Sequence, residues 1–398
     1  MPGEVVIIEG ARTAFSNFGG SLKDVSATDL GVIASQEAIK RSGVDPTELD
    51  NVVFGNVLQT SPDAIYLARH VGLKAGLPIE VPALTVNRLC GSGSQAIINV
   101  AQSILLGESQ AALAGGAENM SQAPHVIRGA RWGLTLGQGG KLEDSLWEAL
   151  IDSYTGQGMA ITAENLAQQY DISRLAQDEY ALRSHQSALA ATESGRLGEE
   201  IVSIEIKDRK GNVKMVNRDE GIRPDTSMEA LSRLPARFIK DKGTVTAGNA
   251  SGITDGAASV VVTSADFAHQ HNLKPLGRVI SWGIVGVPPN LMGIGPAPAI
   301  RQALKKADLR LEDIDLVEVN EAFAAQCCAV EKDLGIQRDR LNVNGGAISL
   351  GHPLGASGAR ITLSVLYELR RRGGRYGIAS ACIGGGQGIA LIVENLQH

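Results

Sequence analysis

The chain has 398 residues and a formal net charge of −6, with 43% hydrophobic and only 4% aromatic residues. Glycine is frequent, since 47 of 398 residues is about 12% against a usual share of roughly 7%, so the backbone needs many positive-φ turns or close approaches. The mild acidity argues against a nucleic-acid or anionic-membrane surface over the whole chain, and no apolar run reaches the roughly 18 residues that span a bilayer. We expect no nucleic-acid or membrane partner and a soluble intracellular protein.

Short apolar strands alternate with amphipathic helices along most of the chain. Strands are predicted at residues 5–9, 52–57, 111–115, 258–263, 316–320, 377–381 and 389–393. This alternation predicts an α/β fold whose sheets are covered by helices on both faces. Residues 121–248 differ in their sequence pattern, because they are predicted to form polar helices, the longest over 162–192. This stretch is interpreted as an insertion.

An internal repeat divides the rest of the chain. The segment from Ala38 (AIKRSGVDPTELDNVVFGNV) resembles the segment from Ala303 (ALKKADLRLEDIDLVEVNEA), an offset of 303 − 38 = 265 residues. The same offset relates Asp50 to Asp315, Val52 to Val317, and Ser92-Gly93 to Ser357-Gly358. Several matches at one offset predict a duplicated α/β unit. The expected division is an N-terminal half (1–120 with 249–270), an inserted loop domain (121–248) and a C-terminal half (271–398).

Cys90 stands where an apolar stretch meets a helix opened by Gly91-Ser92-Gly93. A thiol at a helix N-terminus is favoured as thiolate, which predicts a pKa below about 8.5. The segment alone leaves a nucleophile and a small buried hydrophobe equally open. Its G-x-G-x-x-A spacing also fits a dinucleotide fingerprint, but that fingerprint belongs to the first βα turn, and about 90 residues of α/β pattern precede this one.

His352 lies in a glycine-dense turn, followed by Pro353 and by Gly355-Ala356-Ser357-Gly358, which opens another amphipathic helix. A histidine in such a strand-to-helix turn is a candidate general base, whereas a lone histidine is more often a satisfied core or surface residue.

Two further segments carry polar groups at strand ends. A strand holding Cys382 leads into Gly384-Gly385-Gly386-Gln387-Gly388, a predicted hairpin whose N–H groups could form an oxyanion hole; a plain glycine hairpin is the alternative. Asn320 follows another strand, where its simplest role is to cap a helix. Cys327 and Cys328 lie within that helix and are interpreted as packing residues.

Together, two cysteines and one histidine in separate glycine-rich turns suit acyl transfer through a thioester. A zinc site is disfavoured, because the four cysteines show no C-x-x-C spacing and no fourth ligand is offered, so we expect no bound metal.

These segments resemble the signature blocks of the thiolase family. The matching blocks are NRLCGSGSQ, NEAFA, GHPLGASGAR and SACIGGGQG, in that order, and GTVTAGNASGITDGAA is similar to the family's pantetheine-binding segment. SPDAIYLARHVGL and MGIGP are most similar to the degradative 3-ketoacyl-CoA branch. The resemblance implies a five-layered α-β-α-β-α fold built from two duplicated halves, with the insertion covering a coenzyme A (CoA) site. It also implies a homodimer or homotetramer, with residues 128–144 as a tetramerisation loop, and a cytoplasmic location, or the mitochondrial matrix in a eukaryote.

The resemblance further implies the catalytic roles. Cys90 would be the acylated nucleophile, His352 its activating base, and Cys382 the acid/base that moves a proton to and from the α-carbon of acetyl-CoA. One oxyanion hole would combine His352 with a water held by Asn320, and the other would use the N–H groups of Cys90 and Gly384. Residues expected to contact CoA, a substrate and not a permanently bound cofactor, are Ser251, Arg223, Met159, Ala247, Gly248 and Phe323.

One departure bears on substrate choice. Many biosynthetic acetoacetyl-CoA thiolases carry His-Met-Gly before Thr-Ala-Glu-Asn, whereas this chain reads Gly158-Met159-Ala160-Ile161 there. The implied activity is therefore thiolysis of 3-ketoacyl-CoA over a range of chain lengths, and the reverse Claisen condensation. The alternatives are an acetoacetyl-CoA-specific acetyltransferase, a ketoacyl synthase, which Asn320 and Cys382 disfavour, and a non-catalytic acyl-CoA carrier, which should lack a catalytic residue.

Overall fold

The computed structural model describes residues 3–207 and 211–397 and contains two similar α/β halves. The elements of the first half are β1 (Val5–Thr13), β2 (Ser16–Asn17), α1 (Ala27–Ser42), β3 (Asn51–Gly55), α2 (Leu67–Ala75), β4 (Ala83–Val86), α3 (Ser92–Leu105), β5 (Ala111–Asn119), β13 (Thr254–Ser264) and α8 (Ala265–Gln270). Those of the second are β14 (Gly277–Gly286), α9 (Pro296–Ala307), β15 (Leu316–Val319), α10 (Ala324–Leu334), α11 (Ala347–Leu350), α12 (Leu354–Arg372), β16 (Tyr376–Ile383) and β17 (Gln387–Asn395).

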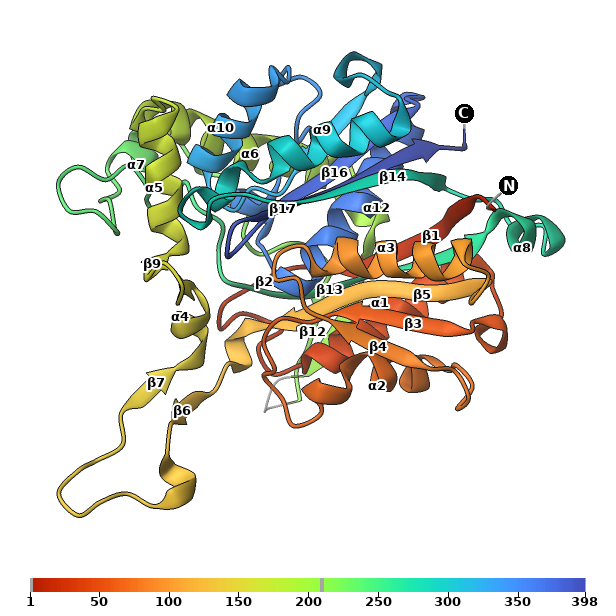
Figure 1. Cartoon of the computed structure of the whole chain (residues 1–398), viewed down its shortest axis with the longest axis horizontal. Helices are drawn as coiled ribbons and strands as arrows, with labels where there is room; N and C mark the ends of the chain where they lie inside the picture. The colour runs from red at the N-terminus through yellow and green to blue at the C-terminus, as the bar shows by residue number, and fades with distance from the viewer. Residues whose placement is uncertain (1–2, 208–210, 398) are drawn as a thin grey trace.

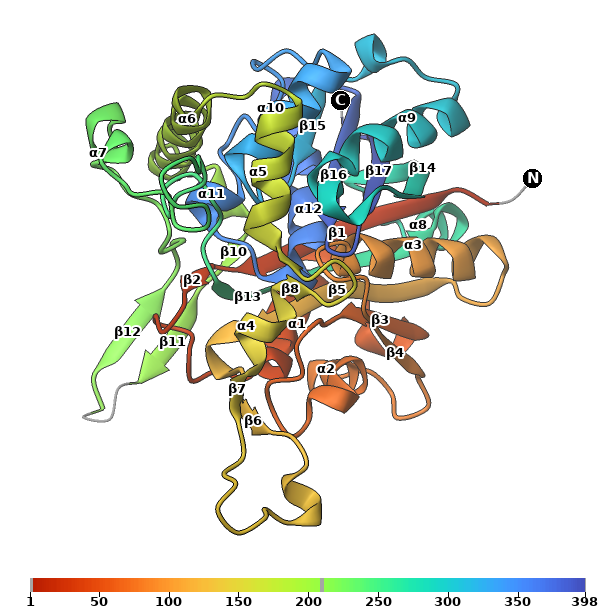
Figure 2. The same ribbon diagram turned by 60° about the vertical axis from the view of Figure 1, so that its left-hand side comes forward.

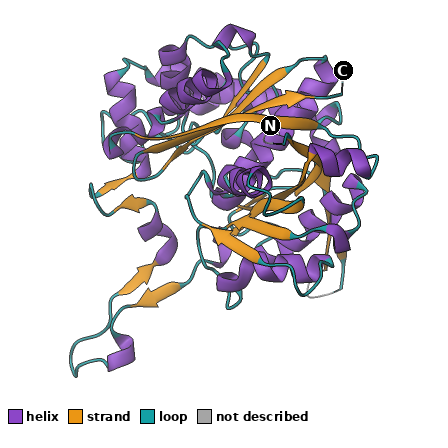
Figure 3. Ribbon diagram, turned by 45° about the vertical axis from the view of Figure 1, so that its right-hand side comes forward, coloured by secondary structure: helices purple, strands orange, loops and turns teal. Residues whose placement is uncertain are grey.

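The strands lie in the order β15-β16-β17-β14-β1-β13-β5-β3-β4. The two halves meet where β1 pairs with β14, at Val6 opposite Arg278 and Ile7 opposite Gly277. Figure 1 shows α3 and α12 between the two sheets, with α1 and α2 outside one sheet and α9 and α10 outside the other. The view coloured by secondary structure shows the same sandwiching of strands by helices (Figure 3). The predicted five-layered α-β-α-β-α fold is thus confirmed.

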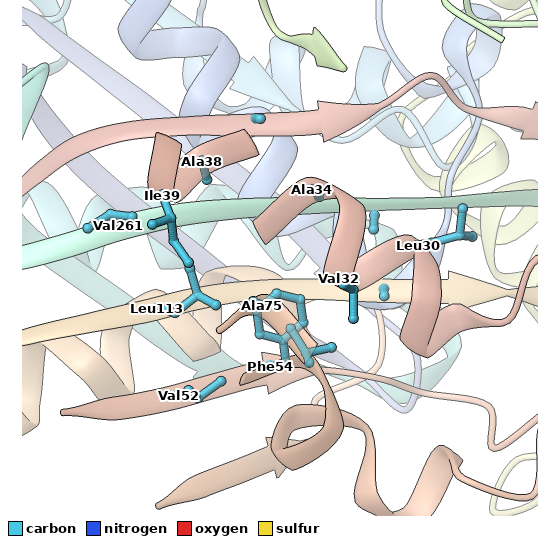
Figure 4. Close-up of a cluster of buried hydrophobic side chains, with 14 of the residues drawn as sticks. Leu30, Val32, Ala34, Ala38, Ile39, Val52, Phe54, Ala75, Leu113 and Val261 are labelled. Atoms are coloured by element: carbon cyan, nitrogen blue, oxygen red, sulfur yellow. The ribbon is translucent and has the colours of Figure 1, made fainter. Parts of the chain in front are cut away.

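Alternate residues of the strands enter different hydrophobic clusters, which explains why these strands are apolar on both faces. Val52 packs with α1 and α2 in the outer cluster drawn in Figure 4, and its neighbour Val53 packs with α3 and α12 in the central one. In the other sheet, Ile392 faces the outer helices, whereas Leu391 faces the centre. The central cluster therefore joins both halves.

The duplication extends to hydrogen bonds at the predicted offset of 265 residues. The Oδ2 atom of Asp50 accepts the N–H of Gln110 at 2.7 Å, and that of Asp315 accepts the N–H of Arg375 at 2.7 Å. Each aspartate thus binds the residue just before a buried strand of its half, β5 in the first half and β16 in the second. Among the described residues, the second half has no full strand corresponding to β4; at that edge of the sheet β15 makes only one bridge, between Val317 and Leu341.

The inserted residues form β6 (His125–Ile127), β7 (Leu142–Asp144), α4 (Ser145–Ala149), β8 (Ile151–Asp152), β9 (Gln157–Gly158), α5 (Met159–Gln169), α6 (Arg174–Glu193), β10 (Ile201–Val202), β11 (Ile204–Lys207), β12 (Val213–Val216) and α7 (Met228–Ser232). Figure 2 shows the β6–β7 hairpin and, at a separate place, the β11–β12 hairpin projecting from the body. Elsewhere the insertion is tied to β1, whose buried Arg12 pairs with Glu200 at 2.9 Å and Asp219 at 2.7 Å.

Two details of the expected elements are wrong. The helix predicted over 162–192 is interrupted: α5 ends at Gln169, Asp171 takes φ +50°, and Ser173 caps α6 through the N–H of Ala176. Strand β14 is missing from the expected elements, because Arg278, Ser281 and Gly283 interrupt its apolar pattern and a glycine stands at each end. A side chain at Gly283 would collide with the backbone of Ala299 in α9.

Candidate active site

Cys90 lies between β4 and α3, one residue before Gly91, the N-cap residue of that helix. The preceding residue, Leu89, has φ +45°, a backbone conformation that few non-glycine residues adopt and that is common at functional sites. Cys90 is half-buried, whereas Cys327, Cys328 and Cys382 are buried. The strained turn therefore presents the thiol of Cys90 at the helix N-terminus, as predicted.

The pKa of Cys90 is opposite to the expectation. Burial of the sulfur raises the pKa to about 11, and the charge of Glu118 adds to this, although hydrogen bonds from the N–H groups of Gly384 and of Cys90 itself oppose it. The thiol of the free protein is thus protonated at neutral pH. The same two N–H groups were predicted as an oxyanion hole, and they converge on the sulfur.

His352 is held at three of its nitrogen atoms. Its backbone N–H donates to Thr254 Oγ1 at 3.0 Å, its Nδ1 lies 2.6 Å from Ser357 Oγ, and its Nε2 lies 3.3 Å from Asn320 Nδ2. Ser357 donates its only hydroxyl hydrogen to the carbonyl of Pro353 at 3.0 Å, so its oxygen accepts the Nδ1–H of His352. This assigns the lone pair to Nε2, which faces Asn320.

The surroundings keep His352 neutral. Burial, with a contribution from the positive charge of Arg360, lowers the pKa of His352 to about 3. A neutral imidazole whose Nε2 carries the lone pair can accept a proton from a thiol in place of its contact with Asn320 Nδ2.

Asn320 follows β15 and is fully buried. It does not cap α10, since that helix begins at Ala324 and its N-cap residue is Phe323. Its Oδ1 atom has no hydrogen-bond partner among the described residues. A buried acceptor of this kind suits an ordered water, and holding such a water stays the predicted role of Asn320.

Cys382 lies in β16 opposite Gly388, beside the hairpin in which Gly385 and Gly386 take φ +79° and +85°. Burial raises the pKa of Cys382 well above its usual range, and the charge of Cys90 raises it further. Its neighbours are Met292 and Ala322, with Met159 and Phe323 packed against them. The second thiol is thus a protonated group in an apolar setting, as a proton donor requires.

A cavity of about 470 Å³ leads to His352. Five of the six residues predicted to contact CoA line it: Ser251, Arg223, Met159, Ala247 and Phe323. Gly248 lies behind the wall, where a Cβ would come within 2.7 Å of Leu231 and 2.5 Å of Leu234. Cys90, Cys382, Asn320 and Gly384 are not among the lining residues.

Sequence reasoning missed several residues of this region. Trp147, Leu150 and Phe238 give the cavity an apolar wall, and Arg237 joins Arg223 as a second positive charge. Ser357, five residues after His352 and so within reach of a helical turn, could have been found from its spacing.

Close backbone packing brings together the two helices that follow the turns of Cys90 and His352. A Cβ on Gly93 of α3 would lie 2.5 Å from the Ala359 nitrogen and 3.1 Å from the Gly358 nitrogen of α12. Gly93 and Gly358 are related by the 265-residue offset, so the duplicated helices touch backbone to backbone near their N-termini.

Residues 5–266 match the N-terminal domain of thiolase, and residues 273–395 match its C-terminal domain. The chain belongs to the thiolase family. Among its relatives, the mitochondrial 3-ketoacyl-CoA thiolase of Homo sapiens is 54% identical over 98% of both chains, and Beta-ketothiolase BktB of Cupriavidus necator is 50% identical over 100% of both. Crystal structures of the human mitochondrial 3-ketoacyl-CoA thiolase, without and with CoA, superpose with TM-scores of 0.97 and 0.96 at 53% identity, each covering 99% of this chain and 99% and 98% of theirs.

Family membership confirms that this thiolase is an acyltransferase, as the motifs predicted. Within residues 3–207 and 211–397, no group of three or more His, Cys, Asp or Glu side chains is placed to hold a metal ion. In the same part of the chain, no helix combines the length and apolarity needed to cross a bilayer.

Proposed function

We propose that this thiolase cleaves 3-ketoacyl-CoA with CoA, giving acetyl-CoA and a shortened acyl-CoA, and catalyses the reverse condensation. The observation that carries the proposal is the pair of His352 Nε2 and Asn320 Nδ2, 3.3 Å apart, with His352 in the wall of a largely apolar cavity that contains two arginines. Gly384, which adjoins Met159 of the same cavity, donates its N–H to the thiol of Cys90. The human relative is named a 3-ketoacyl-CoA thiolase and has been crystallised with CoA, which supports CoA as the substrate that occupies this cavity.

The first half-reaction forms an acyl-enzyme. His352 Nε2 accepts the thiol proton of Cys90 as the sulfur attacks the C3 carbonyl of the substrate. Because burial disfavours separated charges at both residues, proton transfer and attack occur together. The C2–C3 bond then breaks, its electron pair forms the enolate of acetyl-CoA, and Cys382 protonates the α-carbon.

The second half-reaction releases the product. The thiol of a second CoA attacks the thioester carbon and its proton passes to the Cys382 thiolate left by the first half-reaction, while the Cys90 sulfur leaves and takes back the proton held by His352 Nε2. Charge on the thioester oxygens is stabilised by fixed donors, and one such donor has contributed roughly 3–4 kcal/mol in another enzyme. Cys90 and Gly384 supply two N–H groups, and His352 with an Asn320-bound water supplies the other set.

The apolar wall of the cavity and Gly158 favour a range of acyl chain lengths over acetoacetyl-CoA alone. Thiolysis measured with 3-ketoacyl-CoA substrates of four carbons and upward tests this. Comparable kcat/KM values up to medium chains are expected, and a sharp preference for acetoacetyl-CoA would support the acetyltransferase alternative.

Intact-mass measurements test the assigned roles. Cys90→Ser should form no acyl-enzyme from acetyl-CoA, whereas Cys382→Ser should be acylated yet fail to condense. Acylation on Cys327 or Cys328 contradicts the assignment.

We also propose that the chain forms a homodimer or homotetramer. Strand β4 forms a sheet edge with a half-exposed Leu84. The projecting β6–β7 hairpin, residues 125–144, forms an arm that exposes the large apolar side chains Trp132, Leu134, Leu136 and Leu142. Such apolar surface on a projecting arm is typical of an interface. Sedimentation of wild type against Leu136→Asp tests the arm, with smaller assemblies expected for the variant. The three-part domain division and the cytoplasmic or mitochondrial location stay predictions.

A further inference from the structure

We propose that two buried carboxylates, Glu118 and Glu321, are positioning residues that hold the turn carrying His352 from both sides. Glu321 accepts the N–H of Ile348, four residues before His352, and Glu118 accepts the N–H of Gly355, three residues after it. Neither residue lines the cavity. The inference rests on the catalytic role proposed for His352.

Glu118, at the end of β5, is fully buried and joins three segments. Its Oε1 accepts Leu58 N–H at 2.9 Å and Asn56 Nδ2 at 3.2 Å, and its Oε2 accepts Val57 N–H at 3.1 Å and Gly355 N–H at 2.9 Å. Gly355 lies in the first turn of α12, where a helix dipole favours a negative charge. The carboxylate thus anchors the start of α12 to the first half.

Glu321, next to Asn320, makes the corresponding contacts in the second half. It accepts Ser184 Oγ at 2.6 Å, Asn342 Nδ2 at 3.1 Å and Ile348 N–H at 3.2 Å. Both carboxylate oxygens come within 2.7 Å of where a Cβ on Gly346 would stand, so glycine allows this close approach. Ile348 belongs to α11, which leads directly into His352.

The partners explain why carboxylates are used. Every group hydrogen-bonded to Glu118 or Glu321 is a donor, so both oxygens of each side chain must accept. An amide of the same size would turn one acceptor into a donor facing donors. Burial raises the pKa of both residues, that of Glu118 to about 7, and the backbone N–H groups counteract this. The N–H groups thus favour the charged, acceptor-only form.

The two carboxylates thereby fix the position of the His352 imidazole. His352 Nε2 must meet the Cys90 proton and the substrate oxygen, and a displacement of about 1 Å can lower a rate by 10²-fold. The N–H groups that donate to Glu321 and Glu118 lie within four residues of His352. Loosening either contact therefore displaces the imidazole while leaving Arg223, Ser251 and the other expected CoA contacts in place.

The experiment compares Gln and Asp replacements of both residues in the full chain. Acylation of Cys90 is followed by rapid quench and intact mass, CoA affinity by calorimetry, and folding by thermal melting. Glu118→Gln and Glu321→Gln should acylate about 10- to 100-fold more slowly with Kd for CoA within twofold of wild type. Asp50→Asn, a carboxylate bound to a backbone N–H at the other end of β5, is the matched control and should acylate normally.

The order of the replacements separates positioning from packing. Gln keeps the volume of Glu but loses an acceptor, whereas Asp keeps acceptor-only chemistry and loses a methylene. Positioning by acceptance predicts faster acylation with Asp than with Gln, and packing predicts the reverse order, which overturns the inference. If Glu118→Gln does not fold, the order at Glu321 decides.

His352→Ala tells this inference from the proposed function. An inactive His352→Ala protein beside Gln variants that acylate within threefold of wild type refutes the positioning role alone. A His352→Ala protein that acylates normally refutes the proposed function itself.

Discussion

Replacing Ser357 by alanine tests whether one hydroxyl sets the tautomer of the catalytic histidine. In wild type, Ser357 Oγ accepts the Nδ1–H of His352 at 2.6 Å while donating to the Pro353 carbonyl at 3.0 Å. Ser357→Ala leaves the Nδ1–H without an acceptor in a fully buried site, which costs about 1–3 kcal/mol. The alternative tautomer, with the proton on Nε2, avoids this cost but cannot accept the proton of Cys90.

At about 1.4 kcal/mol per factor of ten, this penalty lowers the acylation rate roughly 5- to 150-fold. Rapid-quench intact mass with a 3-ketoacyl-CoA measures the rate, and thermal melting checks folding. Ser364→Ala is the matched control: it lies two turns further along α12, is also buried, and loses one hydrogen bond, to Glu200 at 2.9 Å. Acylation by a folded Ser357→Ala protein within threefold of the control refutes the tautomer assignment.

Three further predictions concern pH, packing and CoA. Because burial lowers the pKa of His352 to about 3 from its usual 6.5, the unfolded chain takes up a proton that the folded one does not, so stability is full above pH 6.5 and falls toward pH 3. Urea unfolding at fixed protein concentration should show that His352→Asn removes about 2 kcal/mol of the loss between pH 7 and pH 5. Gly93→Ala should lower the free energy of unfolding, measured with denaturant, by about 1–3 kcal/mol, because the new Cβ would lie 2.5 Å from the Ala359 nitrogen. An increase in stability, the usual effect of replacing glycine by alanine in a helix, would contradict the close approach. Glu164 accepts the N–H of Thr244 at 2.8 Å, just before the loop that lines the cavity from Thr246 onward. Glu164→Gln should therefore raise KM for CoA about 3- to 10-fold in steady-state thiolysis. A change confined to kcat contradicts this.

The strands that carry the site could be predicted because their burial is extreme. Each of the seven predicted strands overlaps an observed one, since strands covered on both faces are apolar throughout and stand out from amphipathic helices. β14 was not predicted because Arg278, Ser281 and Gly283, the last packed against α9, interrupt that apolar pattern. The break at Asp171 escaped because residues on either side of it are equally helical.

The turns of Cys90 and His352 could be predicted from the sequence for a related reason. Glycines cluster where backbones must approach, and Cys90 and His352 lie inside such clusters. The anchor Glu118 could not be found in this way, because its partners lie 60 to 62 residues before it and 237 after it, at no regular spacing. The pKa of Cys90 was mispredicted for a similar reason: a helix N-terminus is visible in sequence, but the neighbours that bury a sulfur are not.

The contact of Gly93 with Gly358 has a consequence for how the molecule tolerates change. The separation of the nucleophile's turn and the base's turn is set by main-chain atoms of α3 and α12, which have no rotamers to vary. Exchanging core side chains for others of similar volume alters stability but not this spacing. The main-chain contact thus serves both the stability of this thiolase and the spacing of the two turns, so a core side chain of α3 or α12 can be exchanged with less effect on the thiol and the imidazole than Gly93 or Gly358 can.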